Sequence, residues 1–202
     1  MTEKGGQISV NSVNEEIVIR KAETSDIPKL LAIYRPYVEH TAISFEYEIP
    51  SLEEFSGRME TILQTYPYLV AVSGEELIGY AYASEFKNRR AYDWSVETSI
   101  YVKQGQAGKG CGKALYLALE TVLKQQHILN LNACITYTEH EDEYVDNNSM
   151  NFHKHMGYRL VGKFEKCGYK FGRWYDMIWM EKILGPHPAR PEQVIPFCKL
   201  SG

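Results

Sequence analysis

The stretch from Trp94 to Leu123, WSVETSIYVKQGQAGKGCGKALYLALETVL, decides the fold. From Trp94 to Val102 apolar and polar residues alternate, which is the period-2 pattern of a strand with two different faces, and Glu97 falls on the polar face. Glycines interleaved with lysines follow, and from about Lys109 apolar residues recur at helical spacing. The pattern predicts a strand, a glycine-rich loop and a helix, in that order.

The glycine-rich loop is typical of an anion-binding site. Glycines at a helix start let the backbone approach a ligand, and the free N–H groups with the positive end of the helix dipole favour a phosphate. The P-loop motif GxxxxGK[ST] is not met, because Ala114 stands where a hydroxyl is needed, and the Rossmann motif GxGxxG fails at Lys113. The loop predicts a phosphate cradle of another kind; the alternative is a glycine-rich connection without a ligand.

Length and composition predict one folded domain. The chain has 202 residues, 44% of them hydrophobic, and a net charge of -4. The negative charge argues against a nucleic-acid partner or an anionic membrane surface, so a small-molecule substrate is expected. There is no apolar run of about 18 residues and no apolar signal-peptide segment near the N-terminus, so a cytoplasmic location is expected.

The cysteines and the acidic residues do not predict a metal site. The cysteines are far apart, form no CxxC pair and are expected to be reduced: Cys111, Cys134, Cys167 and Cys198. Cys111, inside the glycine loop, is interpreted as a small packed residue rather than as a nucleophile. The run that begins at His140 and continues with three acidic residues is interpreted as a solvated loop, with a site for a hard metal ion as the alternative.

Three parts are expected along the chain: a flexible leader at 1–16, a domain at 17–184, and an extended proline-rich tail at 185–202. Within the domain, strands are predicted at 17–22, 68–72, 77–84, 94–102, 129–137, 158–164 and 174–183, and helices at 24–38, 51–63, 109–123 and 149–157. This order fits a mixed sheet flanked by helices.

Five separated segments carry a family resemblance: TAISFEYE at 41–48, AYDWSVETSIYV at 91–102, AGKGCGKAL at 107–115, NNSMNFHKHMGY at 147–158 and GYKFGRWYDM at 168–177. In this order they resemble the GNAT acyltransferases, and within them the phosphinothricin N-acetyltransferase group, which includes relatives that act on methionine sulfone and sulfoximine. The resemblance covers nearly all of 17–197. It implies the α/β GNAT fold with a mostly antiparallel mixed sheet, acetyl-CoA as co-substrate without a metal, a small amino-acid-like amine as acceptor, and a homodimer.

Two features depart from the family pattern. Ala107 occupies the loop position where an Arg or Gln is usual, and Gln106 stands one position early. An apparent insertion, TEHEDEYV at 138–145, precedes the last predicted helix. This insertion is expected to be a surface loop or to reshape the acetyl end of the cofactor cleft.

The resemblance also implies a cofactor site. Backbone amides of the glycine loop hold the pyrophosphate, and a free N–H near Val102 stabilises the oxyanion that develops on the thioester. The residues implied are Ile100, Tyr101, Val102, Ala107, Gly108, Lys109, Gly110, Cys111, Gly112, Lys113 and Asn147.

The acceptor side requires a base, because an α-amino group holds its proton up to about pH 8. Glu97 is placed to remove that proton, directly or through water; its alternative role is a salt-bridged strand carboxylate. His153 is the candidate acid for the leaving thiolate, or else a packed helix residue. The resemblance assigns the substrate carboxylate to Arg89, with Tyr92 at the other end and Phe45 as a wall; surface charge and aromatic core are the alternatives.

Two other functions remain open at this stage. One is a GNAT enzyme that acts on a different amine, such as a polyamine or a protein N-terminus. The other is a non-catalytic acyl-CoA sensor. The presence of Glu97 together with an intact glycine loop favours an enzyme, because a sensor has no use for a base.

Overall fold

The structure is a computed structural model that describes residues 16–200. The predicted leader, apart from Glu16, lies outside the described residues. The strands are β1 Ile17–Lys21, β2 Tyr68–Ser73, β3 Glu76–Glu85, β4 Ser95–Val102, β5 Asn130–Tyr137, β6 Arg159–Lys170 and β7 Arg173–Ile183. The helices are α1 Ile27–His40, α2 Leu52–Thr65, α3 Cys111–Gln125 and α4 Asn148–His155, and short 3-10 turns lie at Thr24–Asp26, Arg90–Tyr92 and Phe197–Lys199.

Local sequence signals set the ends of the helices. The Ser51 side chain caps α2 by accepting a hydrogen bond from the Glu54 N–H, and Gly157 follows α4 with a φ of 89°. The start of α3 differs from the prediction by two residues. Gly110 has a φ of 90°, which is left-handed, so it is the N-cap and the helix begins at Cys111 rather than at Lys109.

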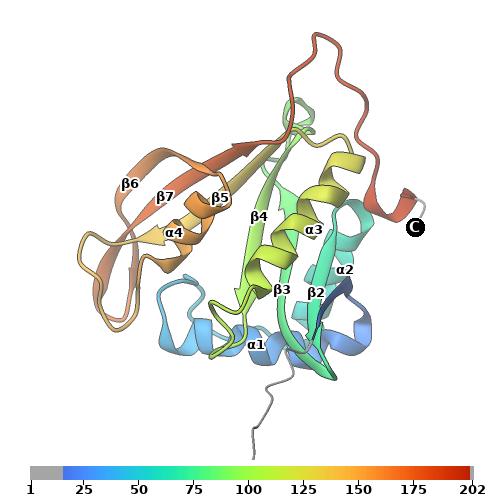
Figure 1. Ribbon diagram of the computed structural model, residues 1–202. Helices are drawn as coiled ribbons and strands as arrows, with labels where there is room; N and C mark the ends of the chain where they lie inside the picture. Colours follow the sequence, from blue (N-terminus) through green and yellow to red (C-terminus); the bar gives the residue numbers. More distant parts are fainter. Residues whose placement is uncertain (1–15, 201–202) are drawn as a thin grey trace, which may run out of the picture.

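Seven strands within the described part of the chain form one sheet in the order β1-β2-β3-β4-β5-β7-β6. All neighbours are antiparallel except β4 and β5, which are parallel, so the predicted mixed and mostly antiparallel sheet is confirmed. The register of β4 with β5 runs only from Ser95–Asn130 to Glu97–Asn132. Beyond Glu97 the two strands diverge, and β5, β7 and β6 swing away from β4 (Figure 1).

Helices cover both faces of the sheet. The α3 helix packs on one face through residues such as Leu115 and Leu119, while α1 and α2 pack on the other through residues such as Leu30 and Met59 (Figure 1). Along β4 the side chains alternate between these faces, as the period-2 pattern predicts. The sheet therefore separates one side of the molecule from the other, and the pairing of β4 with β5 ends at Glu97.

The proline-rich tail returns to its own chain. Residues 184–196 contain neither helix nor strand, and the trace rises from β7 and comes back toward α2 (Figure 1). The Trp94 indole N–H donates to the Glu192 carbonyl at 2.7 Å, and the Gln126 amide donates to the Ile195 carbonyl at 2.7 Å. These bonds hold the second half of the tail against the ends of α3 and β4.

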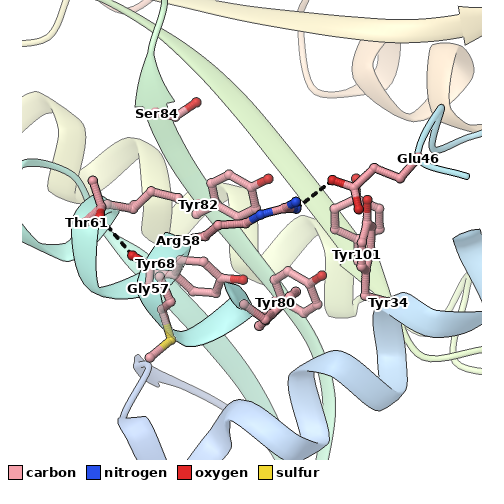
Figure 2. A pocket seen from close by; sticks show the side chains of 13 residues that line it. Tyr34, Glu46, Gly57, Arg58, Thr61, Tyr68, Tyr80, Tyr82, Ser84 and Tyr101 are labelled. Atoms are coloured by element: carbon pink, nitrogen blue, oxygen red, sulfur yellow. Dashed lines mark hydrogen bonds and ion pairs between the residues drawn. The ribbon is translucent and has the colours of Figure 1, made fainter. Parts of the chain in front are cut away.

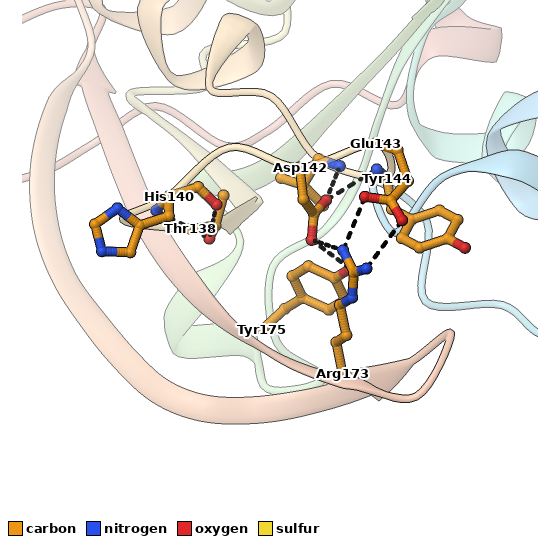
Figure 3. A network of polar contacts seen from close by, with 8 residues as sticks. Thr138, His140, Asp142, Glu143, Tyr144, Arg173 and Tyr175 are labelled. Carbon is orange, nitrogen blue, oxygen red and sulfur yellow. Dashed lines mark hydrogen bonds and ion pairs between the residues drawn. The ribbon is translucent and has the colours of Figure 1, made fainter.

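The insertion at 138–145 is a structured loop (Figure 3). The Asp142 carboxylate accepts hydrogen bonds from the Tyr144 and Val145 amides, at 2.8 and 2.9 Å, and from Arg173 at 2.8 Å. Val145 is buried, and the Ala42 N–H donates to the Tyr144 carbonyl. The loop therefore joins the end of β5 to β7 and to the segment after α1.

Candidate active site

The divergence of β4 and β5 leaves a cleft of about 60 Å³, here called the β4–β5 cleft. Three of the predicted site residues line it: Ile100, Tyr101 and His153. Asp146, directly after the insertion, also lines it, so the insertion leads the chain to the cleft wall. The edge of β4 beyond Glu97 is not paired with β5, which leaves backbone groups of this segment facing the cleft.

The glycine loop lies at one end of this cleft. A side chain at Gly112 would meet the Phe152 ring at 3.1 Å and the Ile100 side chain at 3.5 Å, so the first turn of α3 packs between the cleft and α4. Gly105, Gly108 and Gly110 all have positive φ, between 77° and 90°, and a Cβ at each would meet nothing within 4 Å. These glycines give the loop its curvature and leave its outer surface open.

The start of α3 offers unpaired backbone donors. The first bond within the helix runs from the Ala114 N–H to the Gly110 carbonyl, so the three amides before Ala114 have no partner within the helix. No side chain caps this end. The exposed Lys109 and Lys113 flank it, and Lys109 donates to the Gln106 side chain at 3.1 Å. This end of α3 fits a pyrophosphate.

Asn147 contributes a free acceptor. Its side-chain amide donates to the Thr138 carbonyl at 3.0 Å, and its backbone N–H donates to Glu141 at 3.0 Å. Its Oδ1 is buried and finds no hydrogen-bond partner among residues 16–200. An N–H group of an extended cofactor in the cleft would satisfy this oxygen.

Glu97 lies on the face of β4 that α1 and α2 cover, directly across from Ser84 of β3. Its side chain is half-buried, and within the described chain its carboxylate makes no hydrogen bond or ion pair. Burial raises the pKa of Glu97 above its ordinary value, and the positive charge of Lys87 opposes that rise. The alternative role of a salt-bridged strand carboxylate is therefore not what the structure shows.

His153 is buried and hydrogen-bonded at both ring nitrogens. Nδ1 lies 2.7 Å from the Ser149 carbonyl and must donate to it, which leaves Nε2 to accept from the Tyr116 hydroxyl at 2.8 Å. Burial lowers the pKa of His153 to about 4, so the ring is neutral near pH 7. A neutral ring in this setting fits the packed-residue alternative better than the proton-donor role.

A free backbone N–H that stabilises the oxyanion was predicted near Val102, and the structure shows that it is not the N–H of Val102 itself. The Val102 N–H is not free, because it lies 3.3 Å from the Tyr37 hydroxyl, which in turn donates to the Val102 carbonyl at 2.6 Å. Divergence from β5 begins earlier, directly after Glu97. The unpaired amides closest to Glu97 therefore lie before Val102 on β4.

Cys111 behaves as a packed residue. It is buried at the start of α3, where its thiol lies 3.9 Å from the Ile78 carbonyl. Burial raises the pKa of this thiol to about 11, so it stays protonated near pH 7. The side chain is therefore a poor nucleophile, and only its backbone amide remains available to a ligand.

Of the three residues predicted for the acceptor, Arg89 and Tyr92 share one loop, where the Tyr92 N–H donates to the Arg89 carbonyl at 2.9 Å, and Phe45 lies elsewhere. Arg89 is exposed on the loop after β3, and Tyr92 in the same loop packs its ring 5.8 Å from Phe86. Phe45 lies against the backbone of Gly168, where a Cβ would come within 2.3 Å of its ring, and it does not line the β4–β5 cleft. The structure thus brings Arg89 and Tyr92 together but gives no contact between them and Phe45.

Sequence reasoning missed Lys87, which lies in the same loop as Arg89. Its ammonium group lies 5.0 Å from the centre of the Phe86 ring and 5.3 Å from that of Trp179, and its charge acts on Glu97. The loop sequence KNRR at 87–90 offered several cations, and only the contacts of the folded chain distinguish Lys87 from the others.

A larger cavity was also missed. It measures about 490 Å³, lies between the sheet and helices α1 and α2, and is here called the tyrosine cavity (Figure 2). Its lining residues are Tyr34, Glu46, Phe55, Gly57, Arg58, Met59, Thr61, Ile62, Tyr68, Tyr80, Tyr82, Ser84 and Tyr101. Tyr101 lines both this cavity and the β4–β5 cleft, so the two adjoin at Tyr101 on β4, four residues after Glu97.

Comparison with known proteins identifies the class to which this fold and site belong. Residues 19–179 match the family model described as an acetyltransferase (GNAT) domain, and the chain belongs to that family. It is accordingly an acetyl-CoA-dependent acetyltransferase.

Among its relatives, a phosphinothricin N-acetyltransferase of Streptomyces viridochromogenes is 31% identical over 87% of this chain and 92% of its own length. An L-methionine sulfoximine/L-methionine sulfone acetyltransferase of Pseudomonas aeruginosa is 31% identical over 86% of this chain and 98% of its own length. The crystal structure of a phosphinothricin acetyltransferase from Sinorhizobium meliloti in complex with acetyl-CoA superposes with a TM-score of 0.81, at 34% identity, over 90% of this chain and 96% of that one.

Two further observations concern membrane spans and metal sites. None of the helices in the described part of the chain is long and apolar enough to cross a membrane. Nor do residues 16–200 gather three His, Cys, Asp or Glu side chains in an arrangement that could hold a metal ion.

Proposed function

We propose that this enzyme moves an acetyl group from acetyl-CoA to the amine of a small amino-acid-like substrate of the phosphinothricin or methionine sulfone/sulfoximine type, with Glu97 as general base. One observation carries the proposal. Glu97 is a half-buried carboxylate with no protein partner in the described chain. Its register partner Ser84 on β3 lines the tyrosine cavity, and the next residues of β4, Thr98 and Ser99, line the β4–β5 cleft. The names of the relatives support the substrate type.

Glu97 has the properties that a base for an ammonium group needs. An α-ammonium group titrates near pH 8, so most of it is protonated at pH 7. Because the pKa of Glu97 is raised, it lies closer to the pKa of the amine, which favours proton transfer between them. Glu97 also has no competing ion pair, so its lone pairs are available. The proton passes from the amine to Glu97, directly or through one water.

Bound acetyl-CoA supplies an acetyl thioester to the cleft. The loop amides from Gly108 to Lys113 bind its pyrophosphate, and the Asn147 Oδ1 accepts a hydrogen bond from one of its N–H groups. The unpaired β4 edge between Glu97 and Val102 provides amide donors for the carbonyl oxygen.

The thiolate that leaves needs little help, because a thiol has a pKa near 8.5. His153 is a weak candidate for that proton, since its pKa is lowered to about 4 and both ring nitrogens are engaged. Water is therefore the proposed proton source, and His153 positions Tyr116. For the substrate carboxylate we retain Arg89 and Tyr92 and add Lys87, whose positive charge acts on Glu97.

A panel of amines tests the function. Phosphinothricin, methionine sulfone, methionine sulfoximine, a polyamine and a peptide with a free N-terminus are each offered with acetyl-CoA, and release of CoA is measured. The amino-acid analogues should be acetylated with the highest kcat/KM. A higher value for the polyamine or peptide would replace the proposed substrate class, and acetyl-CoA binding without turnover of any amine would favour a sensor.

A homodimer and a cytoplasmic location complete the proposal. Exposed apolar side chains on β6 and β7, namely Leu160, Val161, Phe164, Tyr169 and Trp174, would be covered by a second copy. The tail is hydrogen-bonded to its own chain, so it is not part of the proposed interface. Light scattering at micromolar concentration tests this part, and a monomer mass would contradict it.

A further inference from the structure

The tyrosine cavity lies on the same side of the sheet as Glu97. Ser84 lines the cavity and is paired in register with Glu97 across β3 and β4. Tyr82, which also lines the cavity, lies within electrostatic reach of three charged groups, since Glu97, Arg58 and Glu46 all act on its pKa. An acceptor whose amine reaches Glu97 therefore has this cavity beside it for the rest of its structure.

The walls of the cavity are aromatic and fixed. The Tyr68 and Tyr82 rings stack 4.8 Å apart, Tyr68 and Tyr80 stack 5.6 Å apart, and Tyr34 meets Tyr101 edge to face at 4.9 Å. Such walls give shape and an apolar surface, but they leave selectivity to the few charged groups present.

Two charged side chains line the cavity, and one of them is incompletely satisfied. The Glu46 Oε1 accepts from Arg58 at 2.5 Å, and the second arm of that guanidinium is taken by Glu54 at 2.6 Å (Figure 2 shows the pair formed with Glu46). The Glu46 Oε2 is shielded from solvent and lacks a hydrogen-bond partner among the described residues, although 34% of the side chain is exposed. A buried carboxylate oxygen of this kind requires a donor.

The segment that carries Glu46 is held firmly. The Glu46 N–H donates to the Ser44 hydroxyl at 3.2 Å, and that hydroxyl is 2.7 Å from the Tyr34 hydroxyl. The buried Lys170 donates to three carbonyl oxygens at the end of α1 and in the segment after it. Glu46 is therefore positioned before a ligand arrives, and it has no need to move in order to bind one.

We infer that the Glu46 Oε2 accepts a hydrogen bond from the side chain of the acceptor, so that this enzyme selects amino-acid-like amines whose side chain ends in an N–H donor. The inference rests on the proposed function and adds a substrate preference to it. Glu46, Arg58 and Glu54 together carry one net negative charge, which also disfavours an anionic side chain at this position. Within the proposed substrate class, methionine sulfoximine should therefore be a better acceptor than phosphinothricin, whose side chain ends in an anionic phosphinate without an N–H.

Two acceptors named for the relatives provide a matched pair. L-methionine sulfoximine and L-methionine sulfone differ in one substituent on sulfur, which is an N–H in the first and an oxygen in the second. With the full chain and saturating acetyl-CoA, kcat/KM should favour the sulfoximine by about tenfold or more, the size expected when a charged acceptor keeps or loses its donor. Equal values in the wild type would overturn the inference without any variant.

Two variants localise the effect. Glu46→Gln keeps the shape but replaces the charged acceptor with an amide that can donate as well, so the preference should fall to within about threefold. Glu54→Gln is the control, because it removes the other carboxylate on Arg58 without touching the cavity, and it should keep the wild-type preference. Thermal unfolding confirms that both are folded. A preference that survives in Glu46→Gln, or that is lost equally in Glu54→Gln, contradicts the inference.

Calorimetric binding of the two acceptors to the CoA complex separates this inference from the proposed reaction. If both are acetylated with equal efficiency, the reaction stands and the inference fails. If neither is acetylated but the sulfoximine binds more tightly through Glu46, the inference stands and the reaction fails. If neither binds nor reacts, both are wrong.

Discussion

The β4–β5 cleft and the tyrosine cavity meet at β4 but are built differently. The cleft is narrow, about 60 Å³, and one of its walls is the edge of β4 that has no β5 partner; the start of α3, nearby, offers backbone amides. The cavity is about 490 Å³ and is lined by residues from α1, α2, β2, β3 and β4 and from the segment after α1.

The cleft and the cavity are therefore expected to recognise ligands in different ways, the first through backbone amides and the second through charged side chains. Backbone amides bind a phosphate without regard to most of the local side chains, so the cofactor side depends on glycines and on strand geometry. The acceptor side depends on individual charges such as Glu46 and Arg58, so a single substitution there can change the substrate. Glu97, the proposed base, lies on β4 beside both regions: Thr98 and Ser99 after it line the cleft, and Ser84 across from it lines the cavity.

Replacing Glu97 should produce the largest effect. Glu97→Gln keeps size but removes basicity, so turnover should fall by roughly two to four powers of ten while acetyl-CoA affinity hardly changes. Stability should not fall, because the carboxylate has no partner in the described chain and its burial already disfavours the charged form. Rate and melting temperature are measured on one sample.

Glu85→Gln is the matched control for that experiment, since Glu85 is an exposed glutamate at the end of β3 and should tolerate the change. A Glu97→Gln enzyme that melts early but turns over normally per folded molecule would remove Glu97 from the mechanism.

The second effect should be confined to the cofactor side. Gly110→Asp adds a negative charge beside the phosphate cradle at a φ of 90°, and Gly112→Asp adds one where a Cβ would meet Phe152 at 3.1 Å. Each should weaken the binding of acetyl-CoA by about a hundredfold or more in calorimetry, because each adds a charge that repels phosphate at the start of the helix.

Gly185→Asp introduces the same side chain at a glycine with open space around it, away from α3, and should bind acetyl-CoA as the wild type does. Melting temperatures separate lost binding from lost folding, which matters most for Gly112→Asp because of Phe152. Unchanged affinity in both loop variants would mean that the cradle lies elsewhere.

The cleft, which depends on backbone geometry, could be predicted from the sequence better than the cavity, which depends on side chains from separate segments. Backbone-built features are encoded locally: the alternation along β4 separates the side-chain faces as predicted, and the glycines marked the loop. The start of α3 was placed two residues early because a glycine can either continue a helix or cap it, and the sequence does not say which φ Gly110 adopts. A free N–H was expected near Val102, but the sequence could not show that the Val102 N–H itself bonds to Tyr37, 65 residues away.

The tyrosine cavity could not be predicted in the same way. Tyr34, Glu46, Arg58 and Tyr101 come from separate segments, and only the packing of α1 and α2 on the sheet brings them together. One signal was present: Tyr101 alternates with the same phase as Glu97, so an aromatic ring beside the base could have been expected. The pairing of Glu46 with Arg58 has no local signature, because 12 residues separate them in an irregular segment and a helix.

The smallest predicted effect concerns Lys87 and tests whether its charge sets the pKa of Glu97. The positive charge of Lys87 stabilises the carboxylate of Glu97 and so lowers its pKa, while burial raises it by more. Lys87→Met keeps the length and the contact with Phe86 but removes the charge, so the pKa of Glu97 should rise further. At acidic pH less Glu97 is then deprotonated, and the acid limb of the kcat/KM profile moves to higher pH. The displacement should be less than about one pH unit, because Lys87 forms no close ion pair with Glu97.

The same acceptor is used for every variant, so that the titration of its own amine cancels and any displacement belongs to the enzyme. Lys87→Arg preserves the charge and should leave the acid limb where it is in the wild type. Above the limb, where Glu97 is deprotonated in all three proteins, their rates should converge, since neither substitution alters the base itself. An acid limb that stays in place in Lys87→Met would mean that Lys87 does not tune Glu97. If the rate instead falls equally at every pH and KM rises, Lys87 binds the substrate carboxylate, and the cation for that role would be Lys87 rather than Arg89.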